Sequence, residues 1–320
     1  MDFYATLGPS CCRADLLAEM ALRGMTGVRL NLSHKRLSEA GAELEALDAA
    51  RARSGVALKL LIDMQGPELR IGALQEPLPL EEGATLPLSS LPLPQALREK
   101  LTSEQELLLD DGKLLLVLTD RDHALVRRGG LLQSRKSVAA PGITLHLPPM
   151  TEDDRAGIAL AAAAGVTGLM QPFVRGREDL EAVRAALNEA RAGQVRLMAK
   201  LENREGLERL PELIDASDEL IIARGDLGNA MPLWELPGVQ KRVSRRCREA
   251  GRPFMVVTQL LASMEERAVP TRAEVSDIFN AVLDGASSLM LTGETAVGRF
   301  PLEAMDYLVR TAAEAQAYRA

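Results

Sequence analysis

Short apolar segments rich in β-branched residues alternate along this chain with longer segments whose apolar residues recur at helical spacing. This alternation predicts a parallel sheet whose strands are joined by crossover helices. The eight predicted strands are residues 3–8, 27–33, 58–66, 166–173, 195–202, 219–226, 253–260 and 287–294. The clearest predicted helices are residues 13–24, 38–55, 177–193, 236–251 and the C-terminal segment 301–320.

The regular spacing of the predicted strands is interrupted once, between the third and the fourth. In this gap, residues 73–137 are dense in Pro and Leu, and the DDGK sequence at 110–113 predicts a hairpin turn. Eight strand–helix units need about 250 residues, which the ranges 1–72 and 138–320 supply. The sequence therefore predicts an α/β fold, a (β/α)₈ TIM barrel with a small β-rich domain inserted after the third strand.

The composition of the chain argues against nucleic acid and membranes as binding partners. Aromatic residues make up 3% of the chain and the net charge is −7, so nucleic acid is not an expected partner. No segment approaches 18 uncharged apolar residues and the N-terminus lacks a signal-peptide pattern, which predicts a cytoplasmic protein without a membrane partner. The 3 cysteines and 3 histidines are too few for a disulfide framework or a histidine-rich metal site. A phosphate ligand therefore needs a local basic cluster or metal ions.

Polar residues spaced two apart near the ends of two predicted strands form the first candidate site. Arg29, Asn31 and Ser33 share one face of the second strand, and Lys200 and Glu202 share one face of the fifth. Active sites of such barrels lie at the carboxyl ends of the strands. The pattern favours a ligand site. A buried Lys–Glu ion pair without function is the alternative interpretation of the second pair, and the residues of the next strand disfavour it.

Carboxylates at the ends of neighbouring strands indicate a divalent cation. Asp226 ends the sixth predicted strand, on a Gly turn that begins a helix, and Glu202 ends the strand before it. Two carboxylates with oxygens from an anionic substrate suit Mg²⁺, and Lys200 lies beside them. The chain contains neither a P-loop sequence nor a dinucleotide-binding glycine motif.

Two further groupings follow from the third strand. Asp63 lies near the end of this strand, and with Asn31 and Ser33 it forms an oxygen-only set suited to a monovalent cation or a water network. Arg70 follows at the start of the insertion. Arg29, Arg70 and Lys200 make up the local positive cluster that an acidic chain needs to bind phosphate.

Signature segments of one known family follow one another in order over nearly the whole chain. They are ATLGPS, VRLNLSH, LIDMQGPELRIG, LLDDGK, RKSVAAPG, AKLEN, IIARGDLG, VVTQLLASM and PTRAEVSDIFNAVLDGASSLMLTGETAVGRFP. In this order they resemble the pyruvate kinase family. The resemblance implies a barrel A domain with a lid-like B domain, and transfer of a phosphoryl group from phosphoenolpyruvate to ADP, giving pyruvate and ATP. It also implies Mg²⁺ (or Mn²⁺) and K⁺ as cofactors, and leaves room for a homo-oligomer through barrel contacts.

The resemblance implies roles for single residues as well. The implied catalytic residues are Lys200, Thr258, Arg29 and Arg70. The implied substrate contacts are Arg29, Lys200, Ala223, Gly225, Asp226, Thr258 and Thr292, and the implied nucleotide contacts are Pro9, Asn31, His34, Arg70 and Lys136. The implied metal ligands are Glu202 and Asp226 for Mg²⁺, and Asn31, Ser33, Asp63 and the Met64 carbonyl for K⁺.

The chain departs from the family pattern at several positions. Gln65 stands in place of Lys, Pro172 and Thr292 in place of Ser, and Ala139 in place of Asn. Gln65 and Thr292 keep hydrogen-bonding capacity, so we expect changes of rate rather than loss of activity. Glu68 stands where K⁺-independent members carry Lys, which predicts activation by K⁺. The family's C-terminal effector domain is absent from the sequence, which predicts no activation by fructose bisphosphate.

Two other interpretations stay open. A Mg²⁺-dependent aldolase or lyase of the phosphoenolpyruvate/pyruvate barrel type needs the same carboxylates, but it has no nucleotide for Arg70 and Lys136 to hold. A catalytically weak homologue kept for binding or regulation is the second. The intact set of Lys200, Glu202, Asp226 and Thr258 disfavours it.

Overall fold

A closed barrel of parallel strands forms the larger part of the computed structural model, which describes residues 1–110, 112–143, 145 and 147–319. The strand order is β1-β15-β14-β13-β12-β11-β3-β2. The strands are β1 (Asp2–Thr6), β2 (Gly27–Asn31), β3 (Lys59–Asp63), β11 (Gly168–Gln171), β12 (Arg196–Leu201), β13 (Glu219–Ala223), β14 (Phe254–Val257) and β15 (Ser288–Leu291). Each lies within a predicted range or begins one residue before it, so the predicted barrel is confirmed.

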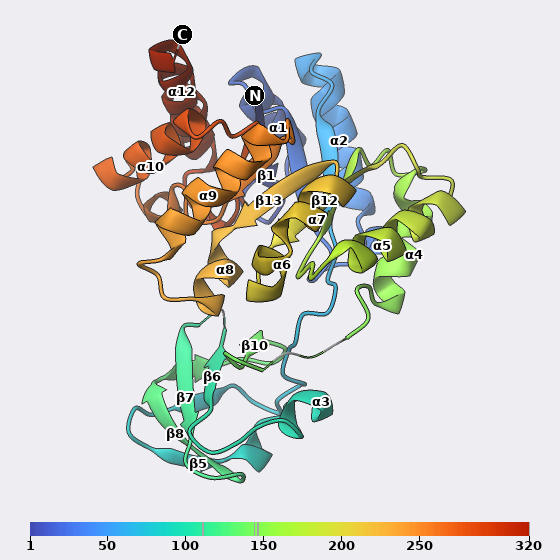
Figure 1. The fold of residues 1–320 in the computed structure, drawn as a ribbon. Helices are drawn as coiled ribbons and strands as arrows, with labels where there is room; N and C mark the ends of the chain where they lie inside the picture. Colours follow the sequence, from blue (N-terminus) through green and yellow to red (C-terminus); the bar gives the residue numbers. More distant parts are fainter. Residues whose placement is uncertain (111, 144, 146, 320) are drawn as a thin grey trace. The chain divides into compact units, whose positions relative to one another are not determined.

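Helices follow the barrel strands and lie around them (Figure 1). The α-helices of this part are α1 (Ala14–Leu22), α2 (Gly41–Ser54), α4 (Glu152–Ala161), α5 (Arg177–Glu189), α6 (Arg204–Glu208), α7 (Leu210–Ala216), α8 (Arg224–Ala230), α9 (Leu236–Glu249), α10 (Arg272–Leu283), α11 (Gly293–Ala296) and α12 (Pro301–Arg319). Short 3₁₀ turns occur at η1 (Leu37–Glu39) and η3 (Ala262–Glu265). Thr151 and Thr271 cap the starts of α4 and α10 with their hydroxyl oxygens, and α2 ends at Gly55 in the left-handed conformation.

The inside of the barrel is filled by apolar side chains from alternate strand positions. They are Tyr4, Leu61, Met170, Met198, Ile221, Ala223, Met255, Val257 and Met290. Because side chains two residues apart on a strand face the same way, Asp63 follows Leu61 and Lys200 follows Met198 on the inward face. Polar groups therefore replace the apolar filling at the carboxyl ends of these strands.

Residues Pro67–Pro148 and Gly228–Leu233 form a second compact unit. Its elements are β4 (Leu78–Leu80), β5 (Thr85–Pro87), η2 (Leu88–Ser90), α3 (Gln95–Arg98), β6 (Glu106–Leu109), β7 (Leu114–Leu118), β8 (His123–Arg128), β9 (Gly130–Leu132) and β10 (Val138–Ala139). The strands form a five-stranded sheet of order β10-β6-β7-β8-β5 and a separate β4-β9 pair. A β-rich unit after the third barrel strand is therefore confirmed.

The second unit has its own core. This core is mostly leucine and includes Leu88, Leu107, Leu109, Leu116 and Leu132, each fully buried. β6 and β7 pair in antiparallel fashion with Leu109 opposite Leu114, which confirms the hairpin predicted at 110–113. Asp111 of this turn lies outside the described residues.

Membrane-spanning and disulfide-bonded segments were not expected. Over the described part of the chain, no helix is long and apolar enough to cross a membrane. Cys11, Cys12 and Cys247 are free, and burial raises the pKa of Cys11 and of Cys247 to about 12. These two thiols therefore stay protonated at neutral pH and pack as apolar groups.

Candidate active site

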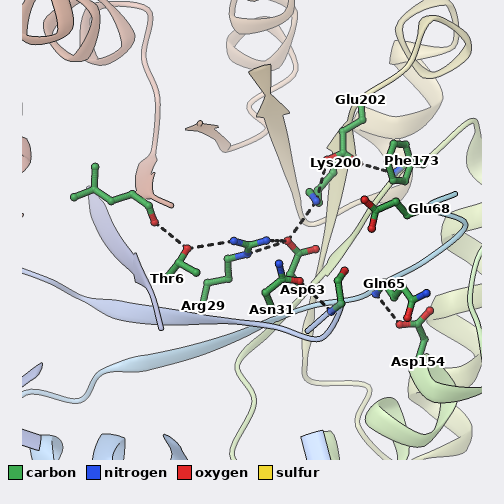
Figure 2. A network of polar contacts seen from close by, with 12 residues as sticks. Thr6, Arg29, Asn31, Asp63, Gln65, Glu68, Asp154, Phe173, Lys200 and Glu202 are labelled. Carbon is green, nitrogen blue, oxygen red and sulfur yellow. Dashed lines mark hydrogen bonds and ion pairs between the residues drawn. The ribbon is translucent and has the colours of Figure 1, made fainter. Parts of the chain in front are cut away.

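The carboxyl ends of β2, β3 and β12 bring two cations and two carboxylates into one cluster (Figure 2). Lys200 Nζ lies 2.9 Å from Glu202 Oε1 and 3.3 Å from Asp63 Oδ2. The Arg29 guanidinium donates from Nη2 and Nε to Asp63 Oδ2, over 2.6 and 2.9 Å. The Lys200 and Arg29 side chains are only 13% and 12% exposed, and both carboxylates are buried. The residues predicted to share a face, Lys200 and Glu202, are thus in contact.

Thr6 extends this cluster to the first and last strands. Arg29 Nη1 donates to Thr6 Oγ1 over 3.3 Å, and Thr6 Oγ1 donates to the carbonyl of Leu291 over 2.9 Å. The N–H of Thr6 donates to Thr295 Oγ1 over 3.0 Å. These bonds fix the guanidinium group between β1 and β3, so Arg29 is held in place before any ligand binds.

The charge of Lys200 is secured by its neighbours. Burial is the largest influence and lowers the pKa of Lys200, but the carboxylates of Asp63 and Glu202, with a smaller contribution from Asp226, raise this pKa above its ordinary value of 10.5. Lys200 therefore stays protonated at neutral pH. It is suited to stabilise negative charge that develops on a ligand and unsuited to act as a general base.

Two buried carboxylate oxygens of the cluster accept no hydrogen bond among the described residues. They are Asp63 Oδ1 and Glu202 Oε1, and the second of these keeps its ion pair with Lys200 Nζ. The other oxygen of Glu202 accepts a hydrogen bond from the N–H of Phe173 over 2.8 Å. Buried acceptors without donors are costly, and a cation is a partner that satisfies them. Over the described residues, no three His, Cys, Asp or Glu groups gather into a metal-binding cluster. A cation here would therefore need further oxygens from a substrate or water.

Asn31 and Ser33 lie beside the end of β3. Asn31 is paired with Asp63 in the register of β2 and β3, and the N–H of Leu32 donates to the Asp63 carbonyl over 2.9 Å. The N–H of Ser33 donates to Asn31 Oδ1 over 3.1 Å. Met64 follows directly, and its N–H donates to the Met170 carbonyl over 3.1 Å. The two strand ends thus supply amide, hydroxyl, carbonyl and carboxylate oxygens close together.

The ends of β13 and β14 carry a second group of predicted residues. Ala223 ends β13, and α8 begins directly after it, which puts Gly225 and Asp226 in the first helical turn. Thr258 follows β14, the neighbouring strand. A Cβ added to Gly225 would lie 3.0 Å from Thr258 Cγ2, so these two residues pack closely.

Thr292 follows β15, where the buried Glu294 fixes its position. Glu294 Oε2 accepts hydrogen bonds from the N–H and the Oγ1 of Thr292, over 2.7 and 3.2 Å. Glu294 Oε1 accepts from the N–H of Leu261 over 3.0 Å. Glu294 is not among the predicted site residues, although it stands three positions after its strand, as Asp226 does after β13.

Pro9 and His34 lie in the turns that follow β1 and β2. Next to Pro9, a Cβ added to Gly8 would lie 2.3 Å from the carbonyl oxygen of Ala296, so this turn packs tightly against α11. His34 is exposed, and its N–H donates to the Asn31 carbonyl over 3.4 Å. Both residues therefore belong to the barrel end that holds the cluster.

Arg70 and Lys136 belong to the second unit. Arg70 Nη2 lies 2.8 Å from Glu68 Oε2, and Arg70 Nη1 donates to the carbonyl of Arg135 over 2.9 Å. Lys136 Nζ lies 2.7 Å from Asp110 Oδ1. Each predicted nucleotide-binding cation of this unit is thus paired with a carboxylate.

Gln65 and Pro172, two of the positions that depart from the family pattern, lie at the end of β3 and beside it. The N–H groups of Gln65 and Gly66 donate to the two carboxylate oxygens of Asp154, over 2.9 and 3.0 Å. Gly66 has a φ of +58°, and a Cβ added there would lie 2.5 Å from Pro172 Cγ. The backbone at the end of β3 is therefore held by Asp154 and confined by the Pro172 ring.

Comparisons with known proteins agree with this arrangement. A family model described as "Pyruvate kinase, barrel domain" matches residues 2–305. The pyruvate kinase of Methylorubrum extorquens is 38% identical over 98% of this chain and 68% of its own length. The pyruvate kinase of Aeropyrum pernix is 37% identical over 98% of this chain and 70% of its own length, and that of Sporosarcina psychrophila is 34% identical over 98% and 56%. This chain spans only part of the length of these relatives, and it belongs to the pyruvate kinase family.

Proposed function

We propose that this chain transfers the phosphoryl group of phosphoenolpyruvate to ADP and releases pyruvate and ATP. The observation that carries the proposal is the protonated, largely buried Lys200 between Asp63 and Glu202, with Arg29 on the other side of Asp63. Two fixed cations at one barrel end suit a small, highly charged phosphate ester. Membership of the family supports the same reaction.

The proposed reaction concentrates negative charge where these cations lie. A terminal phosphate oxygen of ADP attacks phosphorus, the bond to the enolate oxygen breaks, and the electron pair stays on that oxygen until the methylene carbon takes a proton. Lys200 stabilises the charge on the phosphoryl group and the enolate, and Arg29 grips the phosphate. Both groups are held by protein contacts in advance, which avoids reorganisation during the transfer.

We assign the divalent cation, Mg²⁺ or Mn²⁺, to Glu202 and Asp226. The buried Glu202 Oε1 supports this assignment, because its contact is the ion pair with Lys200 and it accepts no hydrogen bond among the described residues. Carboxylate oxygens are the ligands that Mg²⁺ prefers. Bound there, the ion would offset the negative charge of the substrate. Two protein ligands are few, so the ion should bind weakly until the substrate completes its coordination.

We assign K⁺ to Asn31, Ser33, Asp63 and the carbonyl of Met64. The support is the buried Asp63 Oδ1, which has no hydrogen-bond donor among the described residues, next to the oxygens at the ends of β2 and β3. Asp63 Oδ2 is occupied by Arg29 and Lys200. A monovalent cation at Oδ1 would therefore balance the second half of this carboxylate.

The remaining predicted residues take binding roles in this proposal. The substrate carboxylate rests against Thr258 and the backbone of Ala223, Gly225 and Asp226, because the first N–H groups of a helix have no acceptor within the helix. Thr292 adds a hydroxyl contact to the substrate. The proposed nucleotide contacts are Pro9, Asn31, His34, Arg70 and Lys136, and Arg70 also contacts the transferred phosphate.

An assay coupled to lactate dehydrogenase tests the reaction. With the purified chain, we expect pyruvate only when phosphoenolpyruvate, ADP and Mg²⁺ are all present, and a higher rate with K⁺ than with tetramethylammonium. Pyruvate formed equally well without ADP would point to a phosphatase or a lyase. The absence of pyruvate under all conditions would favour a binding or regulatory protein.

A further inference from the structure

Arg224, the first residue of α8, connects three elements of the barrel. Its Nη1 lies 2.8 and 2.7 Å from the two carboxylate oxygens of Asp277, on α10. Its Nη2 and Nε donate to the carbonyl oxygen of Thr258, over 2.7 and 3.2 Å. The Arg224 side chain is only 12% exposed. The guanidinium group therefore spans the ends of β13 and β14 and is itself fixed by α10.

Thr258 needs such support because its backbone is strained. It has a φ of +75°, and Gln259 after it has a φ of +56°. Positive φ is uncommon for any residue except glycine, and for a β-branched residue it is an outlier that surrounding contacts must impose. A planar cation that donates twice to the Thr258 carbonyl is one contact of this kind.

The side chain of Thr258 is confined from the same direction. A Cβ added to Gly225 would lie 3.0 Å from Thr258 Cγ2, which is closer than ordinary contact. The Thr258 methyl group therefore packs against position 225, where a residue larger than glycine would not fit. Gly225 directly follows Arg224 along the chain. Arg224 and Gly225 therefore fix the carbonyl and the methyl group of Thr258, respectively, and the hydroxyl is the polar group of its side chain.

We propose that Arg224 and Asp277 are positioning residues of the active site, which act by holding Thr258 in its left-handed conformation. The inference rests on the proposed function for its effect on turnover. Asp277 orients the guanidinium group, Arg224 anchors the Thr258 carbonyl, and the Thr258 hydroxyl is thereby aimed at the substrate. Neither Arg224 nor Asp277 contacts substrate in this proposal.

Two conservative variants test it. Arg224→Lys keeps the charge but cannot reach Asp277 and the Thr258 carbonyl with one planar group, and Asp277→Asn weakens the hold on Arg224. Since a misplacement of about 1 Å can cost about 100-fold in rate, we expect kcat to fall about 10- to 100-fold in each variant. The KM for phosphoenolpyruvate should change less than about threefold, because the phosphate contacts of Arg29 and Lys200 and the backbone contacts to the substrate carboxylate remain.

Combining Arg224→Lys with Thr258→Ala distinguishes the positioning of Thr258 from a general effect of Arg224 on the structure. In the Thr258→Ala variant the hydroxyl is already lost, so adding Arg224→Lys should lower kcat less than about threefold further. Arg196→Lys is the matched control, because Arg196 pairs with Glu219 over 2.8 Å at the opposite end of the barrel. It should leave kcat unchanged. A loss from Arg224→Lys that is as large in the Thr258→Ala background as in the wild type would overturn the proposal.

A readout independent of turnover completes the test. In protein labelled with ¹³C at the threonine methyl groups, the Thr258 signal should shift or broaden in Arg224→Lys and in Asp277→Asn, and should stay unchanged in Arg196→Lys. An unchanged Thr258 signal in both folded variants contradicts the proposal even if the wild type is active. If the wild type shows no turnover while the signal still moves, the proposed function fails and the positioning contact stands.

Discussion

Asp63 gives one carboxylate oxygen to two cations and keeps the other without a donor among the described residues. Glu202 is divided in a similar way, since one oxygen accepts from the Phe173 N–H and the other faces Lys200. Each carboxylate therefore accepts hydrogen bonds from protein groups on one oxygen at most, and its other oxygen, which for Glu202 is paired with Lys200, can still contact a bound cation. This division explains how a buried cluster can be ordered and still have ligand capacity.

Replacing Lys200 tests the charge at the centre of the cluster. Lys200→Met removes the cation that stabilises the migrating phosphoryl group, so kcat should fall by about 10³, a loss of roughly 4 kcal/mol in transition-state stabilisation. Turnover should be measured on protein whose circular dichroism matches the wild type. The matched control is Lys59→Met, because Lys59 pairs with Asp2 over 2.7 Å at the other end of the barrel. Turnover of Lys200→Met within tenfold of the control would refute the role of Lys200.

At the scale of elements, buried carboxylates connect the loops of neighbouring strands by accepting hydrogen bonds from their backbone N–H groups. Asp154 accepts from the N–H groups of Gln65 and Gly66 after β3, and Glu202 after β12 accepts from Phe173 after β11. Glu294 after β15 accepts from Leu261 after β14. Backbone donors in these loops would otherwise be buried without acceptors. The barrel end that carries the site is therefore ordered by long-range side-chain contacts.

Glu294→Gln tests the hydrogen bonds that Glu294 accepts from the N–H groups of Leu261 and Thr292. The carboxylate accepts on both oxygens, whereas a glutamine side chain has one acceptor oxygen and turns an NH₂ group toward a backbone donor. Because a charged hydrogen bond is lost inside a buried site, we expect the free energy of unfolding to fall by about 2–4 kcal/mol, measured by urea denaturation. Glu303→Gln, at an exposed position of α12, is the control and should change stability little. Equal stabilities of the two variants would contradict the structural role of Glu294.

Two adjacent carboxyl groups at the start of β13 should respond to pH in opposite directions. Burial raises the pKa of Glu219 above its ordinary value of 4.5, and the hydrogen bond from Ser288 and the charge of Arg196 only partly offset it. Burial also acts on Asp218, but hydrogen bonds from Arg184 and the Leu197 N–H outweigh it and hold the pKa of Asp218 below its ordinary value of 3.8.

Proton linkage gives the direction in which each carboxyl group changes the stability of the fold with pH. The folded protein favours protonated Glu219, so this residue's contribution to stability is complete below pH 4.5 and is lost as pH rises through the folded pKa. The stability of Glu219→Gln relative to the wild type should therefore increase from pH 4.5 upward. Asp218 contributes above its ordinary pKa of 3.8, and the loss caused by Asp218→Asn should shrink as pH falls below that value. Parallel pH profiles of the wild type and both variants in denaturant titrations would show that neither shift exists.

Sequence patterns predict the strands better than the side-chain hydrogen bonds that connect the loops after them. The period of two places Lys200 and Glu202 on one face, and their contact at 2.9 Å agrees with it. The same local pattern carries no information on which distant backbone group a side chain meets, and Glu294 and Leu261 are 33 positions apart. Arg224 stands in the signature segment IIARGDLG, yet its partners are Thr258, directly after β14, and Asp277 on α10. The contacts of such residues can be recognised only in the three-dimensional structure, because their partners are distant in the sequence.

At the scale of the whole molecule, the net charge of −7 contrasts with the cations at one barrel end. An acidic protein repels anionic ligands in general, so binding of a phosphate ester depends on groups such as Arg29 and Lys200 that are fixed locally. Within the second unit, Arg70 and Lys136 pair with Glu68 and Asp110. The central claim is the proposed phosphoryl transfer, in which Arg29 and Lys200 stabilise the transferred charge.

The most direct test is ³¹P NMR of one reaction mixture that contains the chain, phosphoenolpyruvate, ADP, Mg²⁺ and K⁺. The account predicts that the phosphoenolpyruvate signal falls while the γ-phosphate signal of ATP rises in equal amount, without free inorganic phosphate, and that omitting Mg²⁺ stops both changes. Consumption of phosphoenolpyruvate with release of inorganic phosphate, or no change in either signal with folded protein, would contradict the account.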